Sequence, residues 1–184
     1  MNTNKNNHIF LKSTFLICLS AFLIFVLYFA KQNITPVIVS GTSMSPTLKE
    51  AEQVIVYKNN DNIKNGDIVS FKAPDEADTY YIKRVIAIEG DTLEYRDGKL
   101  YINGKYIEEP YLDDLKNSER LKDANGITTP DFTLSDLSST NEGKVPKGKL
   151  FVMGDNRIDS KDSRFFGFID VDSVIGTMIY PKHK

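Results

Sequence analysis

An uncharged apolar run near the amino terminus constrains this chain more than any other feature. Between Ser13 and Ala30 there are eighteen residues without a charge, and Phe, Leu, Ile and Val dominate them. A helix of that length is about 27 Å long, which is close to the roughly 30 Å thickness of the hydrocarbon core of a bilayer. The run therefore predicts a membrane anchor within residues 1–31 and a separate domain over residues 32–184.

A cleaved signal peptide is the alternative to an anchor. Such a peptide has an apolar stretch of about 7–15 residues and ends in small residues with the spacing A-x-A. Here Ala30 follows Tyr28 and Phe29, so the small residue two places before it is missing, and we favour an uncleaved single-pass anchor. Lys5 and Lys12 precede the run and no acidic residue offsets them. This charge pattern predicts a cytoplasmic amino terminus and an extracytoplasmic domain in the cell membrane.

Short runs of β-branched and aromatic residues dominate the chain beyond the anchor. Seven of them predict strands, at 54–57, 67–71, 79–88, 92–95, 99–102, 149–153 and 174–180. Asn-Gly and Asp-Gly dipeptides, which suit two-residue hairpin turns, lie at 65–66, 97–98 and 103–104. These features predict an all-β domain of mainly antiparallel sheets.

One polar stretch, from Leu112 to Lys147, interrupts the strand pattern. It has only scattered apolar positions and predicts an inserted excursion, within a broader insertion at about 97–147. A short helix is expected near 113–121. A connection of this length without its own structure is usually functional or mobile.

Charge and residue counts exclude several kinds of function. The chain has 23 basic and 25 acidic residues, so it lacks the clustered basic excess of a nucleic-acid-binding surface. It has one cysteine, Cys18, and two histidines, His8 and His183, so we expect no metal site and no cofactor. Catalysis in the domain must therefore do without imidazole unless the C-terminal tail folds back.

Lysine is the base that the sequence offers. Burial lowers the pKa of a lysine because desolvation disfavours the charged form, whereas arginine stays protonated. In the predicted strand 79–88, alternation places Lys83 on one face with Tyr81, Val85 and Ala87. A lysine on an apolar face is unusual, although an edge-strand lysine that prevents aggregation would give the same pattern.

Four segments resemble the ordered motifs of bacterial type I signal peptidases. The hydroxyl-rich turn Ser40–Leu48, which alone would be read as a surface loop, comes first. Asn65–Val69, Tyr81–Asp91 and Gly154–Arg164 follow in the order of the family. The strings S-M-x-P-T-L and G-D-N-R-x-x-S-x-D-S-R are too long to arise by chance. A single anchor and a small domain resemble the Gram-positive form of the family.

The resemblance implies a serine endopeptidase that removes N-terminal signal peptides from exported preproteins. It implies Ser43 as the nucleophile, because the serine of the family directly precedes a methionine, here Met44, and Lys83 as the general base. The backbone N–H of Ser43 would stabilise the oxyanion. Ser160 matches the serine that hydrogen-bonds the lysine amine. Charged residues that brace the site in the family match Arg84, Asp155, Asp162 and Arg164.

The substrate is expected to bind as an added β-strand along residues 39–42 and 80–82. Shallow apolar pockets would accept small side chains at the first and third positions before the cut, and the candidates for their lining are Ile38, Met44, Val69 and Ile82. Gly41 stands where some members carry a serine hydroxyl in the oxyanion hole, so the hole would rely on main-chain donors. Ser43 is the thirteenth residue after Ala30, and a stretch of that length spans at most about 45 Å. The lipid bilayer is therefore the second expected partner.

Two alternatives compete with a signal peptidase. A self-cleaving protease of the repressor type shares the serine and lysine, but it is soluble and carries a DNA-binding or regulatory segment where this chain carries an apolar run. A catalytically inactive, membrane-tethered β module that binds peptides is the other. The presence of Ser43, Lys83 and Ser160 together argues against that alternative.

Overall fold

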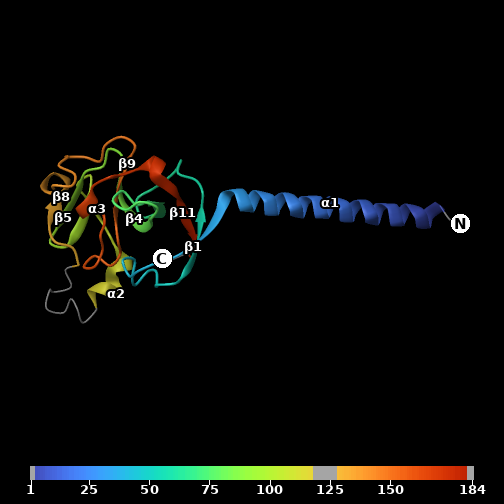
Figure 1. Ribbon diagram of the computed structural model, residues 1–184, viewed down its shortest axis with the longest axis horizontal. Helices are drawn as coiled ribbons and strands as arrows, with labels where there is room; N and C mark the ends of the chain where they lie inside the picture. Colours follow the sequence, from blue (N-terminus) through green and yellow to red (C-terminus); the bar gives the residue numbers. More distant parts are fainter. Residues whose placement is uncertain (1–2, 118–127, 182–184) are drawn as a thin grey trace. The chain divides into compact units, whose positions relative to one another are not determined.

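The computed structural model of the chain describes residues 3–117 and 128–181. It consists of two compact units, Met1–Thr35 and Pro36–Lys184. Helix α1 (Thr3–Asn33) runs without a break through the first unit (Figure 1). Its segment Lys12–Asn33 has a mean hydropathy of 2.3, and in the described part of the chain it is the one helix long and apolar enough to cross a membrane.

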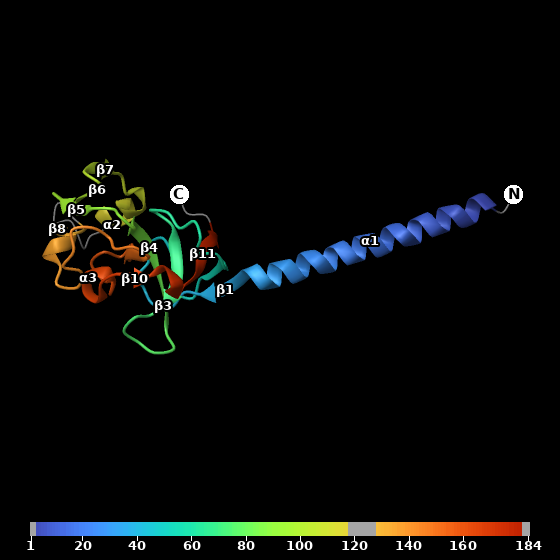
Figure 2. The same ribbon diagram turned by 90° about the horizontal axis from the view of Figure 1, so that it is seen from above.

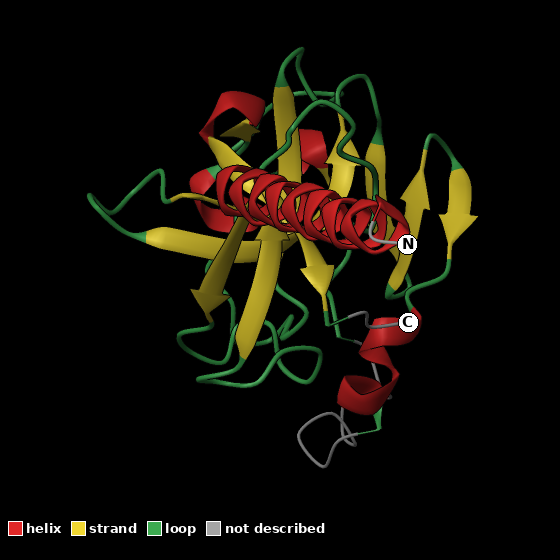
Figure 3. Cartoon of the chain, turned by 90° about the vertical axis from the view of Figure 1, so that its right-hand side faces the viewer, coloured by secondary structure: helices red, strands yellow, loops and turns green. Residues whose placement is uncertain are grey.

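Two mainly antiparallel sheets form the second unit, as Figures 2 and 3 show. The seven-stranded sheet has the order β1-β2-β11-β3-β4-β9-β10 and the four-stranded sheet the order β7-β6-β5-β8. The bounds of the strands are β1 Ile34–Ile38, β2 Gln53–Tyr57, β3 Ile68–Lys72, β4 Tyr80–Ile88, β5 Leu93–Arg96, β6 Lys99–Ile102, β7 Lys105–Ile107, β8 Phe132–Thr133, β9 Lys149–Met153, β10 Ile169–Asp170 and β11 Val174–Tyr180. The predicted all-β fold is confirmed.

Each of the seven predicted strands lies within one residue of an observed strand. Four further strands, β1, β7, β8 and β10, escaped prediction. β1 contains Pro36, which is depleted in strands. β7 has three residues, and β8 and β10 have two each, so they are too short to show alternation. The described helices of the second unit are short: η1 Pro110–Leu112, α2 Asp113–Lys116, η3 Leu134–Asp136, α3 Ser163–Phe166 and η4 Val171–Ser173.

Two of the three predicted hairpin turns are confirmed. Asp97-Gly98 joins β5 to β6 and Asn103-Gly104 joins β6 to β7, and all four residues have positive φ angles of 52–76°. That conformation is the one a two-residue type I′ turn requires. The prediction at Asn65-Gly66 is wrong, because β11 lies between β2 and β3 and no hairpin joins them.

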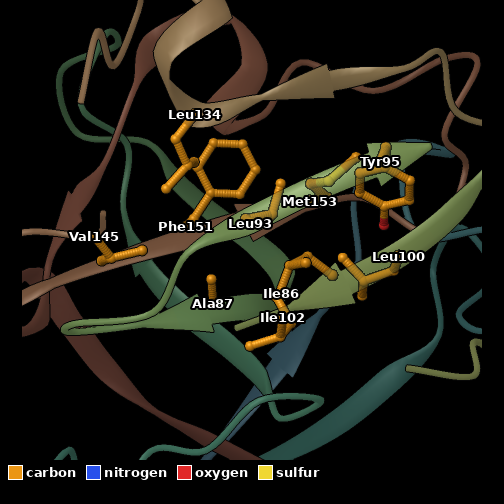
Figure 4. Close-up of a cluster of buried hydrophobic side chains, with 10 residues drawn as sticks. All are labelled: Ile86, Ala87, Leu93, Tyr95, Leu100, Ile102, Leu134, Val145, Phe151 and Met153. Carbon is orange, nitrogen blue, oxygen red and sulfur yellow. The ribbon is translucent and has the colours of Figure 1, made fainter. Parts of the chain in front are cut away.

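The region after residue 97 is not a simple excursion from the core. Its strands pack with β4 and β9 in one apolar cluster, drawn in Figure 4, which consists of Ile86, Ala87, Leu93, Tyr95, Leu100, Ile102, Leu134, Val145, Phe151 and Met153. Burial of these side chains ties the two sheets together. Helix α2 covers the start of the helix predicted near 113–121, and the rest of that prediction lies outside the described residues.

Strand β4 carries the lysine singled out from the sequence. Lys83 lies opposite Val69 of β3, and Tyr81 and Val85 pack on the same cluster as Val69. The prediction fails at Ala87, because the register shifts between Val85 and Ala87 and Ala87 joins the other cluster. Since β4 lies between β3 and β9, Lys83 is not an edge-strand lysine, and the aggregation-blocking alternative is wrong.

Candidate active site

Hydrogen bonds and buried apolar side chains fix the turn that carries Ser43. The N–H of Ser45 donates to Thr42 O and that of Leu48 donates to Met44 O, each at 2.9 Å. Met44 and Leu48 are fully buried in a cluster with residues of β2 and β3. This burial anchors the turn, and the half-buried Ser43, directly before Met44, lines a groove.

The side chains of Ser43 and Lys83 meet. Lys83 Nζ lies 2.6 Å from Ser43 Oγ, which is hydrogen-bonding distance, and Lys83 is only 4% exposed. Burial lowers the pKa of the Lys83 amine to about 8, and the nearby carboxylates of Asp162 and Asp155 oppose this effect. A neutral amine beside a hydroxyl can accept its proton.

Two arginine–carboxylate pairs support the neighbouring loops. Arg84 binds Asp155 through two hydrogen bonds of 2.8 and 2.6 Å, and Asp155 also accepts from Thr47 of the Ser43 turn. Arg164 binds Asp162 through two hydrogen bonds of 2.8 Å. All four residues expected to brace the site are therefore in ion pairs, and none of them contacts Ser43 Oγ or Lys83 Nζ by a recorded hydrogen bond.

A groove of about 280 Å³ begins at Ser43 and Lys83. Residues 37–43 form one wall and residues 80–83 form the other, with Asp159 and Lys161 near the site. Ile38 and Ile82 line it as expected. Met44 and Val69 do not, because each is fully buried in an apolar cluster of the core. Sequence alternation shows which residues share a face, but it does not show which face the core covers.

Comparisons with known proteins show the family of the chain. A family model described as "Signal peptidase, peptidase S26" matches residues 9–181. The chain belongs to this family. Signal peptidase I V of Bacillus subtilis is 45% identical over 143 residues, which cover 76% of this chain and 80% of that protein. Signal peptidase IB of Staphylococcus aureus is 42% identical over 165 residues, which cover 85% of this chain and 82% of that protein.

A solved structure supports the fold of the signal peptidase domain. The crystal structure of a signal peptidase I from Enterococcus faecalis matches with a TM-score of 0.59 and 41% sequence identity. The match covers 64% of this chain and 97% of that one. The family resemblance seen in the sequence is thus confirmed, and with it the class of serine endopeptidase.

One expected contact of the signal peptidase site is absent. Ser160 Oγ is buried, yet it makes no hydrogen bond to Lys83 or to any other described residue. Its side chain instead packs against Gly154, where a Cβ would collide with Ser160 Oγ and with Ser43 O. The absence of a side chain at Gly154 therefore lets Ser160 lie beside the main chain of Ser43.

Sequence reasoning assigned no role to two residues of the same loop, Asn156 and Arg157. Asn156 hydrogen-bonds the main chain of the Ser43 turn. Arg157 is buried and binds Glu109. Both lie in the G-D-N-R string that carried the resemblance, so the motif marked the loop without showing what these side chains contact.

Proposed function

We propose that this chain is a membrane-tethered signal peptidase in which Ser43 and Lys83 remove N-terminal signal peptides from exported preproteins. The observation that carries the proposal is the 2.6 Å approach of the buried Lys83 amine to Ser43 Oγ. Family membership over residues 9–181 supplies the substrate class. The apolar helix α1 fits a membrane tether.

The proposed chemistry is acyl transfer. Neutral Lys83 removes the proton of Ser43 as Oγ attacks the scissile carbonyl, and the resulting ammonium protonates the leaving amine. Water then attacks the acyl-enzyme, with Lys83 again accepting a proton, and releases the carboxyl end of the signal peptide. Because imidazole is absent from the described part of the domain, the lowered pKa of Lys83 is what makes this cycle accessible near neutral pH.

The oxyanion is proposed to bind main-chain N–H groups, that of Ser43 included. Gly41 supplies no hydroxyl, and its φ of 81° is a conformation that side chains disfavour. The preprotein would pair as an extended strand with the walls of the groove. Ile38 and Ile82 are proposed to limit the side chains before the cut to small ones.

The orientation in the membrane is part of the proposal. Lys5 and Lys12 precede the apolar segment and no acidic residue does, which favours a cytoplasmic amino terminus. The catalytic domain then faces the side to which preproteins are exported.

Cleavage of a preprotein by the detergent-solubilised full chain tests the proposal. Ser43→Ala and Lys83→Ala are expected to lower kcat by at least about 10³-fold with the fold intact. Lys72→Ala, which removes an exposed lysine from the neighbouring strand β3, should keep wild-type activity. Sequencing the new amino terminus of the product identifies the cut.

Full activity in Lys83→Ala contradicts the Ser–Lys mechanism. A wild-type chain that binds signal peptides and cleaves none supports instead the inactive peptide-binding module.

A further inference from the structure

One residue holds both carbonyls of the nucleophile segment. The backbone N–H of Asn156 donates to Ser43 O at 3.0 Å, and its side-chain Nδ2 donates to Thr42 O at 3.1 Å. Asn156 is 5% exposed, so both hydrogen bonds form away from solvent. No other described residue outside the turn hydrogen-bonds both carbonyls.

These two hydrogen bonds fix the backbone on both sides of the Ser43 Cα atom. Thr42 O belongs to the peptide unit that also carries the N–H of Ser43. Because that unit is planar and trans, anchoring its oxygen determines where the N–H points. Ser43 O belongs to the next peptide unit. With both planes held, φ and ψ of Ser43 are set, and so is the direction of its Cα–Cβ bond.

Asn156 makes these contacts at a cost to stability. Its Oδ1 atom is buried without a hydrogen-bond partner among the described residues. An unsatisfied buried acceptor is unfavourable for folding. The amide cannot turn over to relieve this, because its oxygen would then face Thr42 O. Stability alone therefore does not favour asparagine at this position.

The residues on either side hold Asn156 in place. Asp155 is bound by Arg84. Arg157 donates from Nε to Gly154 O at 3.1 Å, and from its backbone N–H to Asp155 O at 3.0 Å. The loop thus has anchored neighbours on both sides of the side chain that reaches the Ser43 turn.

We propose that Asn156 is a positioning residue that aims the N–H and the side chain of Ser43 by clamping the two adjoining peptide units. The proposal rests on the function proposed above for Ser43. It differs from the action of Lys83, because Asn156 sets backbone direction and takes no proton.

Steady-state cleavage of a preprotein by the full chain carrying Asn156→Ala tests the side-chain part of this role. The variant loses the Nδ2 hydrogen bond to Thr42 O and keeps the backbone N–H that donates to Ser43 O. Removing one oxyanion donor costs serine peptidases about 10²–10³ in kcat, so loosening its aim should lower kcat by about 10- to 100-fold. KM should stay within about twofold, and the pH at which kcat/KM falls should not move, because Lys83 is untouched. The melting temperature should stay close to wild type, since the variant also removes the unpaired Oδ1.

Asn60→Ala is the matched control. Asn60 Nδ2 also donates to a main-chain carbonyl, Val171 O, at 3.2 Å, at a position that does not line the groove. This variant should keep wild-type kcat. Asn156→Asp keeps the side-chain volume but loses the donor, and it decides the question if Asn156→Ala fails to fold. Its plateau kcat should fall in the same way.

The outcomes separate this inference from the function on which it rests. Wild-type kcat in Asn156→Ala, or in a folded Asn156→Asp, overturns the positioning role while Ser43→Ala remains inactive. A fall in kcat together with a large rise in KM and a large fall in melting temperature also overturns it, because that result indicates a purely structural role. If Ser43→Ala cleaves normally, the proposed function itself has failed.

Discussion

At the scale of single residues, the environment of Lys83 decides what the site can do. The amine lies on an interior strand, 4% exposed, and desolvation lowers its pKa to about 8. Asp162 and Asp155 work against that effect, so they limit how far the pKa falls. The balance leaves a minor but substantial neutral fraction near pH 7, which is the range where a general base is most effective.

Activity should therefore depend on pH through Lys83. The neutral amine is the active form, so kcat/KM is expected to fall about tenfold per pH unit below about pH 8. Above that value it should reach a plateau. The measurement is kcat/KM for a synthetic preprotein fragment from pH 6 to pH 10. A midpoint near the roughly 10.4 of a free lysine would contradict the assignment of Lys83.

Stability offers an independent check on the same pKa. The pKa of Lys83 is 10.5 unperturbed and about 8 in the fold, so between these values the unfolded chain binds more protons and the free energy of unfolding rises with pH. Lys83→Met removes this dependence. At pH 7 the variant should be more stable than wild type by up to about 3 kcal/mol, and the difference should shrink from pH 8 to pH 10.5 in denaturant titrations. A difference that is constant with pH would contradict the assignment.

At the scale of elements, the insertion after β5 supports the loop that carries Asp155, Asn156 and Arg157. Arg157 is fully buried and pairs with Glu109 at 2.5 Å. It also donates to the hydroxyl of Tyr95 at 2.6 Å. Burial raises the pKa of Tyr95, so this phenol stays protonated and donates to Glu109. Tyr111 stacks on Arg84 at 3.8 Å, which connects the same segment to the Arg84–Asp155 pair.

Glu109→Gln is expected to destabilise the domain strongly. The substitution leaves the Arg157 charge buried without a counterion, and breaking a buried pair in this way costs about 3–5 kcal/mol. Glu94→Gln is the control, because the Glu94–Arg96 pair is exposed and should contribute at most about 1 kcal/mol. Thermal and denaturant unfolding measure both. Equal small effects would show that the buried Glu109–Arg157 pair does not stabilise the domain.

The same elements show how far sequence reasoning reaches. The seven longer strands were predictable because β-branched runs bounded by turn residues are local signals. The stretch after Leu112 was predicted as a polar excursion because its apolar residues are scattered, yet Leu134 and Val145 pack in the core. Ser43 and Lys83 were named from family motifs, and their side chains meet in the structure. Met44 and Val69 were misplaced in the groove, and Asn156 was missed because a side chain that binds main-chain carbonyls has no characteristic sequence spacing.

At the scale of the whole molecule, the proposed function places the amino terminus and the catalytic domain on opposite sides of the membrane. The charge pattern before the apolar segment predicts a cytoplasmic amino terminus. The chain has one cysteine, Cys18, which lies within α1. Replacing it gives a cysteine-free background in which any single position can be labelled.

Single-cysteine labelling in intact cells tests the orientation. In a Cys18→Ser background, Lys58→Cys, at an exposed position of the domain, should react with a membrane-impermeant maleimide. Asn4→Cys, before the apolar segment, should react only after the membrane is permeabilised. Both variants should retain preprotein cleavage, because Lys58 does not line the groove and Asn4 lies outside the catalytic domain. Labelling of Asn4→Cys in intact cells together with protection of Lys58→Cys would contradict the proposed orientation. It would also contradict the proposed function, because an enzyme that faces the cytoplasm could not meet preproteins after export.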